Sequence, residues 1–443
     1  MQDPLTVAIN AQISIDYPGG SETNVVSLMK AIGETHRDEK FLFVNKRKNS
    51  QGLLSYTGLN QKFIDWPFSQ VGYPVPLTFR RPLGVRAKKF RDMTGPFGPG
   101  VTLAYWIYRG SRDLYQRLSH PPQQNPTARE VDPILRAQGV SIVHFPYAQY
   151  FETTLPFIYE PWDLQHCHYP EFFSKKEWAW RDRLYRDGCQ RAHLIVTATQ
   201  WVKQDLVAQY SITPNKIAVI PRNSLLTHTA LPQAKEAAAW QRYSIPKIFV
   251  FYPAMTFPHK NHIRLLQALA QLRNESGIIL PLVCSGRIYE PHWPKIHAEI
   301  ERLQLQSQIK FLGVVSAELL SSLFKNAQFV IYPSLFEGLG LPILEAMQYG
   351  TPILASNATC IPEVVGDAAR LFDGHRVEAI CEALTEAVTN PDLLKQVSSR
   401  GAKQLQRFSW EKAVKTFIAC YRSSAGWSLS DEQQCLLAEA TGT

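Results

Sequence analysis

An apolar strand over residues 329–332 is followed by a glycine turn and a helix, and the segment 332–373 constrains the fold more than any other. It reads YPSLFEGLGLPILEAMQYGTPILASNATCIPEVVGDAARLFD. Gly338 and Gly340 carry no Cβ atom, so the backbone there can pass close to a ligand. Pro342 stands at a first helical turn, where its missing N–H costs nothing. The start of such a helix offers unpaired N–H groups and a positive dipole end to an anion, most naturally a phosphate.

Two carboxylates flank this anion site. Glu337 precedes the turn and Glu345 lies about one turn into the helix, with seven residues between them. One carboxylate on each side suits a ligand that has hydroxyl groups on both sides of a phosphate. A nucleotide diphosphate sugar is such a ligand, and an ordinary strand–loop–helix unit with two solvated Glu side chains is the plainer alternative.

Apolar, strand-like segments alternate with helical patterns along most of the chain. This alternation predicts parallel sheets with right-handed crossovers. Because 443 residues are too many for one hydrophobic core, we expect two domains. The predicted strands are 5–13, 40–45, 140–147, 157–160, 193–199 and 216–221 in the first half, and 248–253, 280–285, 310–314, 329–332 and 353–355 in the second.

Residues 332–373 resemble the donor-binding signature of family 4 retaining glycosyltransferases, which have the GT-B fold of two Rossmann-like domains. The likeness covers about forty consecutive positions. In that family the first Glu contacts the transferred sugar near the reacting centre, the second Glu binds the ribose hydroxyls, and the amides between them hold the diphosphate. The resemblance implies these roles, in turn, for Glu337, for Glu345, and for the backbone of Gly338, Leu339, Gly340 and Leu341.

The resemblance implies an α/β protein whose two doubly wound domains face each other across a cleft. We place the first, acceptor-side domain at residues 1–224, a linker at 225–246 and the donor-binding domain at 247–408. A short helix is expected within the linker, at about 233–243. In GT-B proteins the last helix often crosses back to the first domain, and residues 409–443 are expected to do so. Arg222, just before the linker, is expected to reach the cleft.

Lys260 follows the first strand of the second half, in the sequence FYPAMTFPHKNHIRLLQAL. A cation there can neutralise the diphosphate of a departing nucleotide without a metal. The segment looks like the family's phosphate-binding element, which usually has an Arg five residues before the Lys. Met255 stands at that position, so either His259 or Arg287 supplies a second charge or the site works with one cation.

Glycines after other strands are the remaining donor-side candidates. The resemblance implies that Ser285, Gly286 and Gly313 approach the nucleotide and its base. Gly19 and Gly20 match a loop that faces the donor phosphates and the acceptor in the family. A glycine at the end of a strand is, on its own, more often part of an ordinary turn.

The acceptor side is predicted at residues 162–170, WDLQHCHYP, which follow an apolar strand. Many relatives carry His-Asp-Leu here; in this chain Trp162 replaces the His and Asp163 is retained. Either His166 or His168 then acts on the acceptor, the main chain does so, or the segment is purely structural. Two His residues two positions apart can also bind a metal, but no Cys or His set completes a zinc site, so no metal is expected.

The net charge of +9 and the pI near 9.1 favour anionic partners such as nucleotide sugars, phospholipid surfaces or acidic glycans. Residues 75–117 combine Arg and Lys with Tyr and Trp, which suits an interfacial helix on an anionic membrane. A solvated insertion over the acceptor cleft is the plainer alternative. Single-stranded nucleic acid also suits this mixture, but no zinc finger, basic zipper or RNP signature supports it.

The seven cysteines are scattered and form no C-x-x-C pair, which is typical of proteins in a reducing cytoplasm. The N-terminus MQDPLTVAIN has no basic region followed by a long apolar core, so no signal peptide is expected. No uncharged apolar run of about 18 residues predicts a transmembrane helix. We therefore expect a cytoplasmic protein, at the inner face of the membrane if residues 75–117 bind lipid.

Three absent motifs narrow the enzyme class. The chain has no Asp-x-Asp, no Gly-x-Gly-x-x-Gly after the first strand and no Walker A sequence, which disfavours metal-dependent single-domain glycosyltransferases, NAD dehydrogenases and ATPases. The expected function is a metal- and cofactor-independent retaining glycosyltransferase that moves a mannose- or glucose-type sugar from a nucleotide diphosphate sugar to a hydroxyl of a glycan or lipid-linked glycan, as in polysaccharide biosynthesis.

Three alternatives to this function remain at the level of sequence. Trp162 and Met255 suggest a catalytically inactive subunit that binds a sugar nucleotide. A sugar phosphorylase on the same fold is the nearest alternative among enzymes. A non-enzymatic lipid- or nucleic-acid-binding protein would use residues 75–117.

Overall fold

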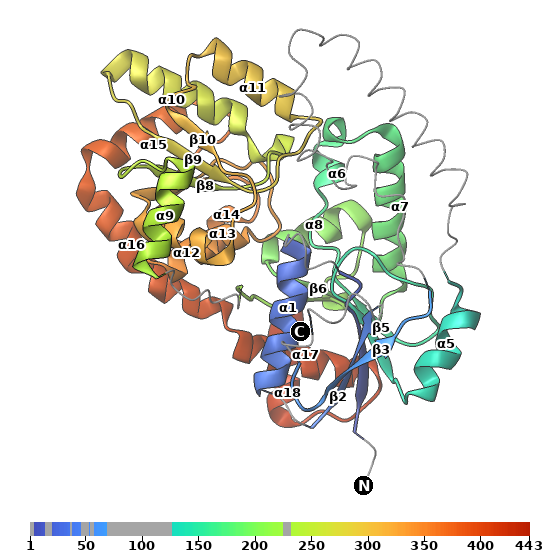
Figure 1. The fold of residues 1–443 in the computed structure, drawn as a ribbon. Helices are drawn as coiled ribbons and strands as arrows, with labels where there is room; N and C mark the ends of the chain where they lie inside the picture. The colour runs from blue at the N-terminus through green and yellow to red at the C-terminus, as the bar shows by residue number, and fades with distance from the viewer. Residues whose placement is uncertain are drawn as a thin grey trace, which may run out of the picture.

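The described part of the protein contains two parallel β-sheets with helices packed around them (Figure 1). The structure is a computed structural model and describes residues 4–13, 20–35, 38–45, 53, 57–68, 126–224 and 232–443. Residues 75–117, including all of their basic and aromatic side chains, and Gly19 lie outside these ranges. The two sheets confirm the predicted α/β class with two doubly wound units.

The first sheet has seven strands in the order β3-β2-β1-β4-β5-β6-β7, and every neighbouring pair is parallel. Six of these strands fall within predicted segments. The exception is β3, an edge strand in which Gln61, Lys62 and Asp65 interrupt the apolar pattern. The strands are β1 (Thr6–Asn10), β2 (Lys40–Asn45), β3 (Gln61–Asp65), β4 (Ile142–Phe145), β5 (Phe157–Tyr159), β6 (Leu194–Thr197) and β7 (Ile217–Val219).

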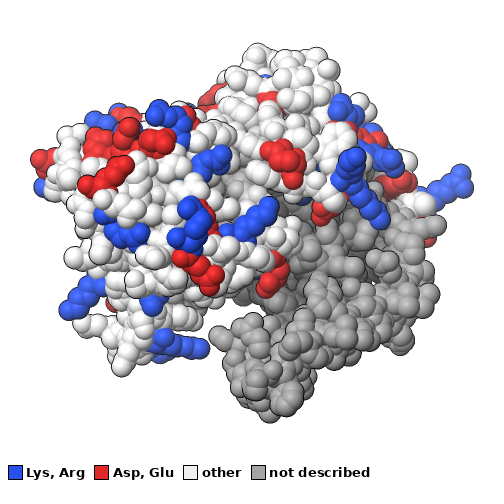
Figure 2. Space-filling view, turned by 90° about the horizontal axis from the view of Figure 1, so that it is seen from above, with Lys and Arg blue, Asp and Glu red and all other residues white. Residues whose placement is uncertain are grey.

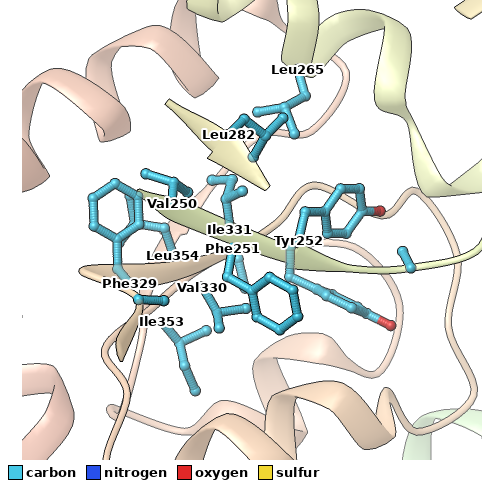
Figure 3. Packing of buried hydrophobic residues seen from close by; sticks show 14 of the residues in the cluster. Val250, Phe251, Tyr252, Leu265, Leu282, Phe329, Val330, Ile331, Ile353 and Leu354 are labelled. Atoms are coloured by element: carbon cyan, nitrogen blue, oxygen red, sulfur yellow. The ribbon is translucent and has the colours of Figure 1, made fainter. Parts of the chain in front are cut away.

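The second sheet has six parallel strands in the order β10-β9-β8-β11-β12-β13. Five were predicted; β13, which has three residues, was not. Buried side chains of β8, β11 and β12 pack closely in its core, among them Phe251, Phe329 and Ile331 (Figure 3). The strands are β8 (Val250–Pro253), β9 (Leu282–Ser285), β10 (Ile309–Phe311), β11 (Phe329–Tyr332), β12 (Ile353–Ser356) and β13 (Arg370–Phe372).

Helices connect the strands and cover the sheets. The α-helices are α1 (Gly20–Thr35), α5 (Ala128–Ala137), α6 (Gln165–His168), α7 (Lys175–Arg191), α8 (Gln200–Tyr210), α9 (Gln233–Tyr243), α10 (His262–Ser276), α11 (Trp293–Arg302), α12 (Ala317–Asn326), α13 (Leu341–Gln348), α14 (Ile361–Val365), α15 (Val377–Thr389), α16 (Pro391–Leu405), α17 (Trp410–Ser424) and α18 (Asp431–Thr441). The 3₁₀ helices are η3 (Pro170–Phe172), η4 (Pro214–Lys216), η5 (Pro258–Lys260) and η6 (Gln406–Phe408).

Helix α9 packs against the second sheet, although it falls within the predicted linker. The Trp240 ring lies 5.7 Å from the Phe249 ring, and its Nε1 donates to Ser322 Oγ over 3.3 Å. The linker predicted at 225–246 therefore contains a helix that belongs to the second domain, while residues 225–231 lie outside the described ranges.

Helix α17 crosses from the second domain to the first. It packs against α1, and its buried residues share a core with β1 and β2. The Tyr421 hydroxyl lies 2.7 Å from Nδ1 of the buried His144 on β4. The end of the chain thus closes one face of the first sheet.

Candidate active site at the domain boundary

Lys260 and Glu337 form an ion pair in the second domain. Lys260 Nζ lies 2.5 Å from Glu337 Oε1, and the two side chains are only 15% and 11% exposed. The Tyr332 hydroxyl donates to the same carboxylate oxygen over 3.0 Å and accepts from Lys260 Nζ over 3.3 Å. The Tyr252 hydroxyl donates to the carbonyl of Lys260 over 2.5 Å. The structure thus joins two residues that were predicted from separate motifs.

The strand order explains why these residues meet. Lys260 ends the connection between β8 and α10, and Glu337 lies in the loop between β11 and α13. These strands are neighbours at the point where the strand order reverses, and ligands of open α/β sheets bind at the carboxyl ends of the strands at such a point. Asn261 ties the two loops together, because its Nδ2 donates to the carbonyls of Pro333 and Gly374 over 3.0 and 2.7 Å.

The glycine turn has the geometry that the sequence predicts. Gly340 has φ +79°, and α13 begins at the next residue with Pro342 in its first turn. A Cβ atom on Gly338 would lie 2.3 Å from the carbonyl oxygen of Trp162, which belongs to the first domain. Only glycine at position 338 therefore allows this close contact between the domains.

Glu345 lies one turn into α13 and is partly exposed. Burial raises the pKa of its carboxyl from 4.5 to about 7. Desolvation destabilises the charged form of this carboxyl, and hydrogen-bond donors stabilise it. Ribose hydroxyls are such donors. Its position and its pKa therefore fit the ribose-binding role that the resemblance implies.

Glu345 should make the stability of the protein depend on pH. Its pKa is about 7 when folded and 4.5 when unfolded, so ionisation disfavours folding. The penalty is absent below about pH 4.5 and complete above about pH 7, where it amounts to at most about 3 kcal/mol. Glu345→Gln should therefore unfold at a higher temperature than the wild type at pH 8, by roughly 5 °C, and at nearly the same temperature at pH 5. Thermal unfolding of both proteins at pH 5 and pH 8 measures this difference in melting temperature. The same difference at both pH values would contradict the prediction.

The other donor-side glycines lie at the ends of β9 and β10. Ser285 is buried at the last position of β9. Gly286 has φ +127°, its N–H donates to the carbonyl of Gly313 over 2.8 Å, and a Cβ atom there would lie 2.6 Å from the carbonyl of Ala254. Gly313 has φ +70°. These residues bring the loop after β9 close to the loop that holds Lys260.

His259 does not supply the positive charge that is missing because Met255 stands in place of the usual Arg. Burial lowers the pKa of His259 well below its ordinary value, and the neighbouring Lys260 lowers it further. The imidazole is therefore neutral near pH 7. Two of the three alternatives then remain: Arg287 supplies the second charge, or the site works with one cation.

Trp162 and Asp163 face this site from the first domain. Trp162 has φ +72°, which is rare for a bulky residue and is a form of backbone strain found at functional sites. Its Nε1 donates to the carbonyl of Pro146 over 2.8 Å. Asp163 lies against Gly338, and burial raises its pKa, with Glu337 acting in the same direction. The structure thus places Asp163 near the Lys260–Glu337 pair.

His166 does not reach this site. Its side chain is fully buried, with Nε2 3.0 Å from the hydroxyl of Tyr210 and the ring 5.2 Å from Tyr185. Burial lowers its pKa to about 4. Because a buried imidazole enclosed by α7 and α8 cannot touch an acceptor, the geometry gives no support to the catalytic role predicted for His166.

Two family models match this chain. One, described as Glycosyl transferases group 1, matches residues 233–404, and the other, Glycosyltransferase Family 4, matches residues 85–222. Together they span more than half of the sequence. The chain belongs to the family 4 glycosyltransferases.

Curated relatives agree with this assignment. The O-antigen chain mannosyltransferase B of Escherichia coli is 31% identical over 263 residues, which are 57% of this chain and 66% of that protein. The MMP alpha-(1->4)-mannosyltransferase of Mycolicibacterium hassiacum is 30% identical over 52% of this chain and 54% of its own length. The chain thus matches less than two thirds of either relative.

The GT-B fold follows from structural similarity. The crystal structure of Anabaena HepE in complex with UDP and glucose has a TM-score of 0.64 and covers 95% of this chain and 100% of its own, at 16% identity. Both sheets of this glycosyltransferase therefore have the GT-B arrangement. None of the helices in the described ranges combines the length and the hydropathy needed to span a bilayer.

One group of side chains in the described part of this family 4 glycosyltransferase has the spacing of a metal site. Ligand atoms of His166, Cys167 and Asp182 lie within 4.8 Å of one another. Asp182 already accepts from Arg186 and from the Tyr210 hydroxyl, each over 3.2 Å. Burial raises the pKa of the Cys167 thiol to about 11, which disfavours the thiolate that a metal needs. These contacts account for the cluster without a metal.

Several residues at the domain boundary were not predicted from the sequence. A small cavity is lined by Gly338 on one side and by Asn24, Glu160 and Arg222 of the first domain on the other. Arg222 is ion-paired with Glu160, both are almost fully buried, and its Nε donates to Asn24 Oδ1 over 2.8 Å. Arg222 was predicted to reach the cleft, but its partners come from other strands and helices, and no local motif marks them.

Proposed function

We propose that this family 4 glycosyltransferase is a retaining, metal-independent hexosyltransferase. It moves a mannose- or glucose-type sugar from a nucleotide diphosphate donor to a hydroxyl of a glycan or lipid-linked glycan. The ion pair between Lys260 and Glu337, beside the glycine turn and opposite Asp163, is the observation that carries this proposal. The two relatives named as mannosyltransferases favour mannose.

Each donor-side group has a task in this scheme. The backbone of residues 338–341 binds the diphosphate at the start of α13, and Glu345 accepts hydrogen bonds from the ribose. Lys260 stabilises the negative charge that develops on the leaving phosphate. Glu337 lies beside the transferred sugar and holds the Lys260 ammonium in place.

The transfer step exchanges one bond for another at the anomeric carbon. The bond from this carbon to the phosphate oxygen breaks, and a bond to the acceptor oxygen forms on the same face of the sugar. The departing phosphate takes the proton of the acceptor hydroxyl, so no metal or separate base is required. Contact between the domains excludes water during this step.

A catalytically inactive sugar-nucleotide subunit is the second candidate. Met255 leaves the donor site without the usual Arg, and Trp162 replaces the usual His at the acceptor side. A sugar phosphorylase would need free phosphate in place of a nucleotide. One turnover assay distinguishes both alternatives from the main proposal. An inactive subunit would show no turnover, and a phosphorylase would depend on free phosphate.

Residues 75–117 are proposed to contact an anionic membrane surface, with the protein in the cytoplasm. These residues lie outside the described ranges. On the face drawn in Figure 2, Lys and Arg lie among Asp and Glu over the described surface. Lys and Arg side chains therefore do not form one large patch on that part of the face.

A nucleotide sugar should stabilise the native protein. A ligand that binds only the folded state adds about 2.7 kcal/mol at a hundredfold excess over its Kd. In a thermal-shift screen of UDP-, GDP- and ADP-sugars, at least one donor should raise the melting temperature by several degrees. Glu345→Gln should weaken this effect, and Glu378→Gln, an exposed control in the same domain, should not. No shift with any donor would contradict the proposed donor site.

A further inference from the structure

The backbone of Glu337 is held by two residues that lie 22 and 23 positions later. The Glu337 N–H donates to Thr359 Oγ1 over 3.1 Å, and the same hydroxyl donates to the Glu337 carbonyl over 3.0 Å. The Cys360 thiol also donates to this carbonyl, over 3.1 Å. Both polar groups of the Glu337 backbone are therefore bonded to one short segment.

Thr359 holds this position in a strained conformation. Its φ is +49°, in the left-handed region that a β-branched residue rarely adopts. Such strain persists only where the surroundings enforce it, and it is concentrated at functional sites. Here the two hydrogen bonds to the Glu337 backbone offset the cost of the strained conformation.

The same segment continues into α14, which binds the first domain. Glu363 Oε1 accepts from the N–H of Gln200 over 2.8 Å, and Oε2 accepts from the N–H of Trp201 over 2.9 Å. These N–H groups are the unpaired donors at the start of α8, where the helix dipole favours a negative charge. A carboxylate of the second domain therefore caps a helix of the first.

Two further contacts surround this cap. Thr199, the N-cap residue of α8, donates from Oγ1 to the carbonyl of Gly338 over 3.1 Å. The ring of Phe336 is buried, 5.4 Å from Trp201 and 5.1 Å from the ring of His168. The residues on both sides of Glu337 are thus attached to the start of α8, which lies near α13 and α14 in Figure 1.

We propose that Thr359 and Glu363 are positioning residues that couple domain closure to the placement of the Glu337 carboxylate. Glu363 can bind the N–H groups at the start of α8 only when the domains are in contact. This contact fixes the position of the segment that contains Thr359, and Thr359 in turn fixes the Glu337 backbone. Closure and assembly of the reacting site are then one event. This inference rests on the proposed transfer function.

The first test uses Glu363→Gln and Glu363→Ala, with Glu378→Gln as the matched control. Glu378 occupies the first turn of α15 and is exposed. We expect kcat to fall about 10-fold in the Gln variant and more in the Ala variant, with the donor KM changed less than about 3-fold. The share of donor hydrolysed by water should rise relative to transfer. A Glu363→Ala variant with wild-type kcat would overturn the proposal, as would a loss confined to KM.

The second test isolates the Thr359 hydroxyl. Thr359→Val keeps the branched shape and loses both hydrogen bonds to Glu337, whereas Thr359→Ser keeps the hydroxyl. The Val variant should lose at least about 10-fold in kcat, and the Ser variant should stay within about 3-fold of the wild type. Equal activity in the two variants would show that the hydroxyl does not position Glu337.

A measurement without turnover keeps the inference separate from the proposed function. Small-angle X-ray scattering of the full chain should give a larger radius of gyration for Glu363→Ala than for the wild type and Glu378→Gln. Equal radii would overturn the cap as a closure contact even if the enzyme is active. A wild type that is inactive with every donor would refute the transfer function, and a larger radius for Glu363→Ala would still support the cap.

Discussion

Lys260→Met is expected to reduce the rate of sugar transfer by about 100- to 1,000-fold, because it removes a preorganised cation from the charge that develops on the leaving phosphate. The loss should appear mainly in kcat, since this charge is largest in the transition state. Steady-state kinetics with a saturating acceptor measure it. Lys295→Met, which removes an exposed lysine of the same domain, should leave the rate unchanged.

Stability data decide whether such a loss is catalytic or structural. Lys260→Met leaves the largely buried carboxylate of Glu337 without its ion-pair partner, which should cost roughly 3 kcal/mol of unfolding free energy. The double variant Lys260→Met/Glu337→Gln removes both charges and should regain most of that stability while remaining inactive. If the double variant recovered activity together with stability, Lys260 would have only a structural role.

Glu337→Gln is the second large effect, with an expected loss of about 100-fold in kcat. The substitution keeps the size of the side chain and the hydrogen bond from Tyr332, but it removes the charge that holds Lys260 and faces the sugar. Because Glu345 and the glycine turn remain in place, the donor KM should change less than about 3-fold.

Glu301→Gln, an exposed substitution in α11, is the matched control for this variant. Both kinetic constants should equal those of the wild type. A Glu337→Gln enzyme with undiminished kcat would contradict the role of the first carboxylate. A rise in the donor KM of about 100-fold with an unchanged kcat would show that Glu337 only binds the donor.

The donor half of the site was largely predictable because its chemistry is local in sequence. Glu337, the glycine turn and Glu345 lie within nine positions, and Pro342 marks the start of the helix between them. The ion pair with Lys260 was not predictable as a contact. It depends on β8 and β11 being neighbours, and strand order is a property of the sheet as a whole.

The acceptor half was harder to predict, and the two histidines show why. His166 and His168 lie two positions apart on the one-turn helix α6, so their side chains leave it in different directions. His166 enters the core of the first domain, whereas His168 faces Phe336 of the second. A motif gives the residue types, but burial decides which of them can meet a ligand.

The contacts of Thr359 and Glu363 could not be predicted from the sequence, although both residues lie in the segment 332–373 that resembles the family signature. Their partners are backbone groups of Glu337 and of the start of α8. Backbone partners impose no residue type, so the sequence does not reveal which groups Thr359 and Glu363 contact. The contact also spans 163 positions between Gln200 and Glu363, and the structure alone brings the two together.

The most direct test of the central claim is the release of nucleoside diphosphate from a panel of nucleotide sugars, with and without a glycan acceptor. The wild type should release the nucleotide in an acceptor-dependent manner with at least one donor, and Lys260→Met should reduce that release about 100-fold or more. Release that is absent with every donor, or equal in the two proteins, would contradict the assignment of this site as the centre of sugar transfer.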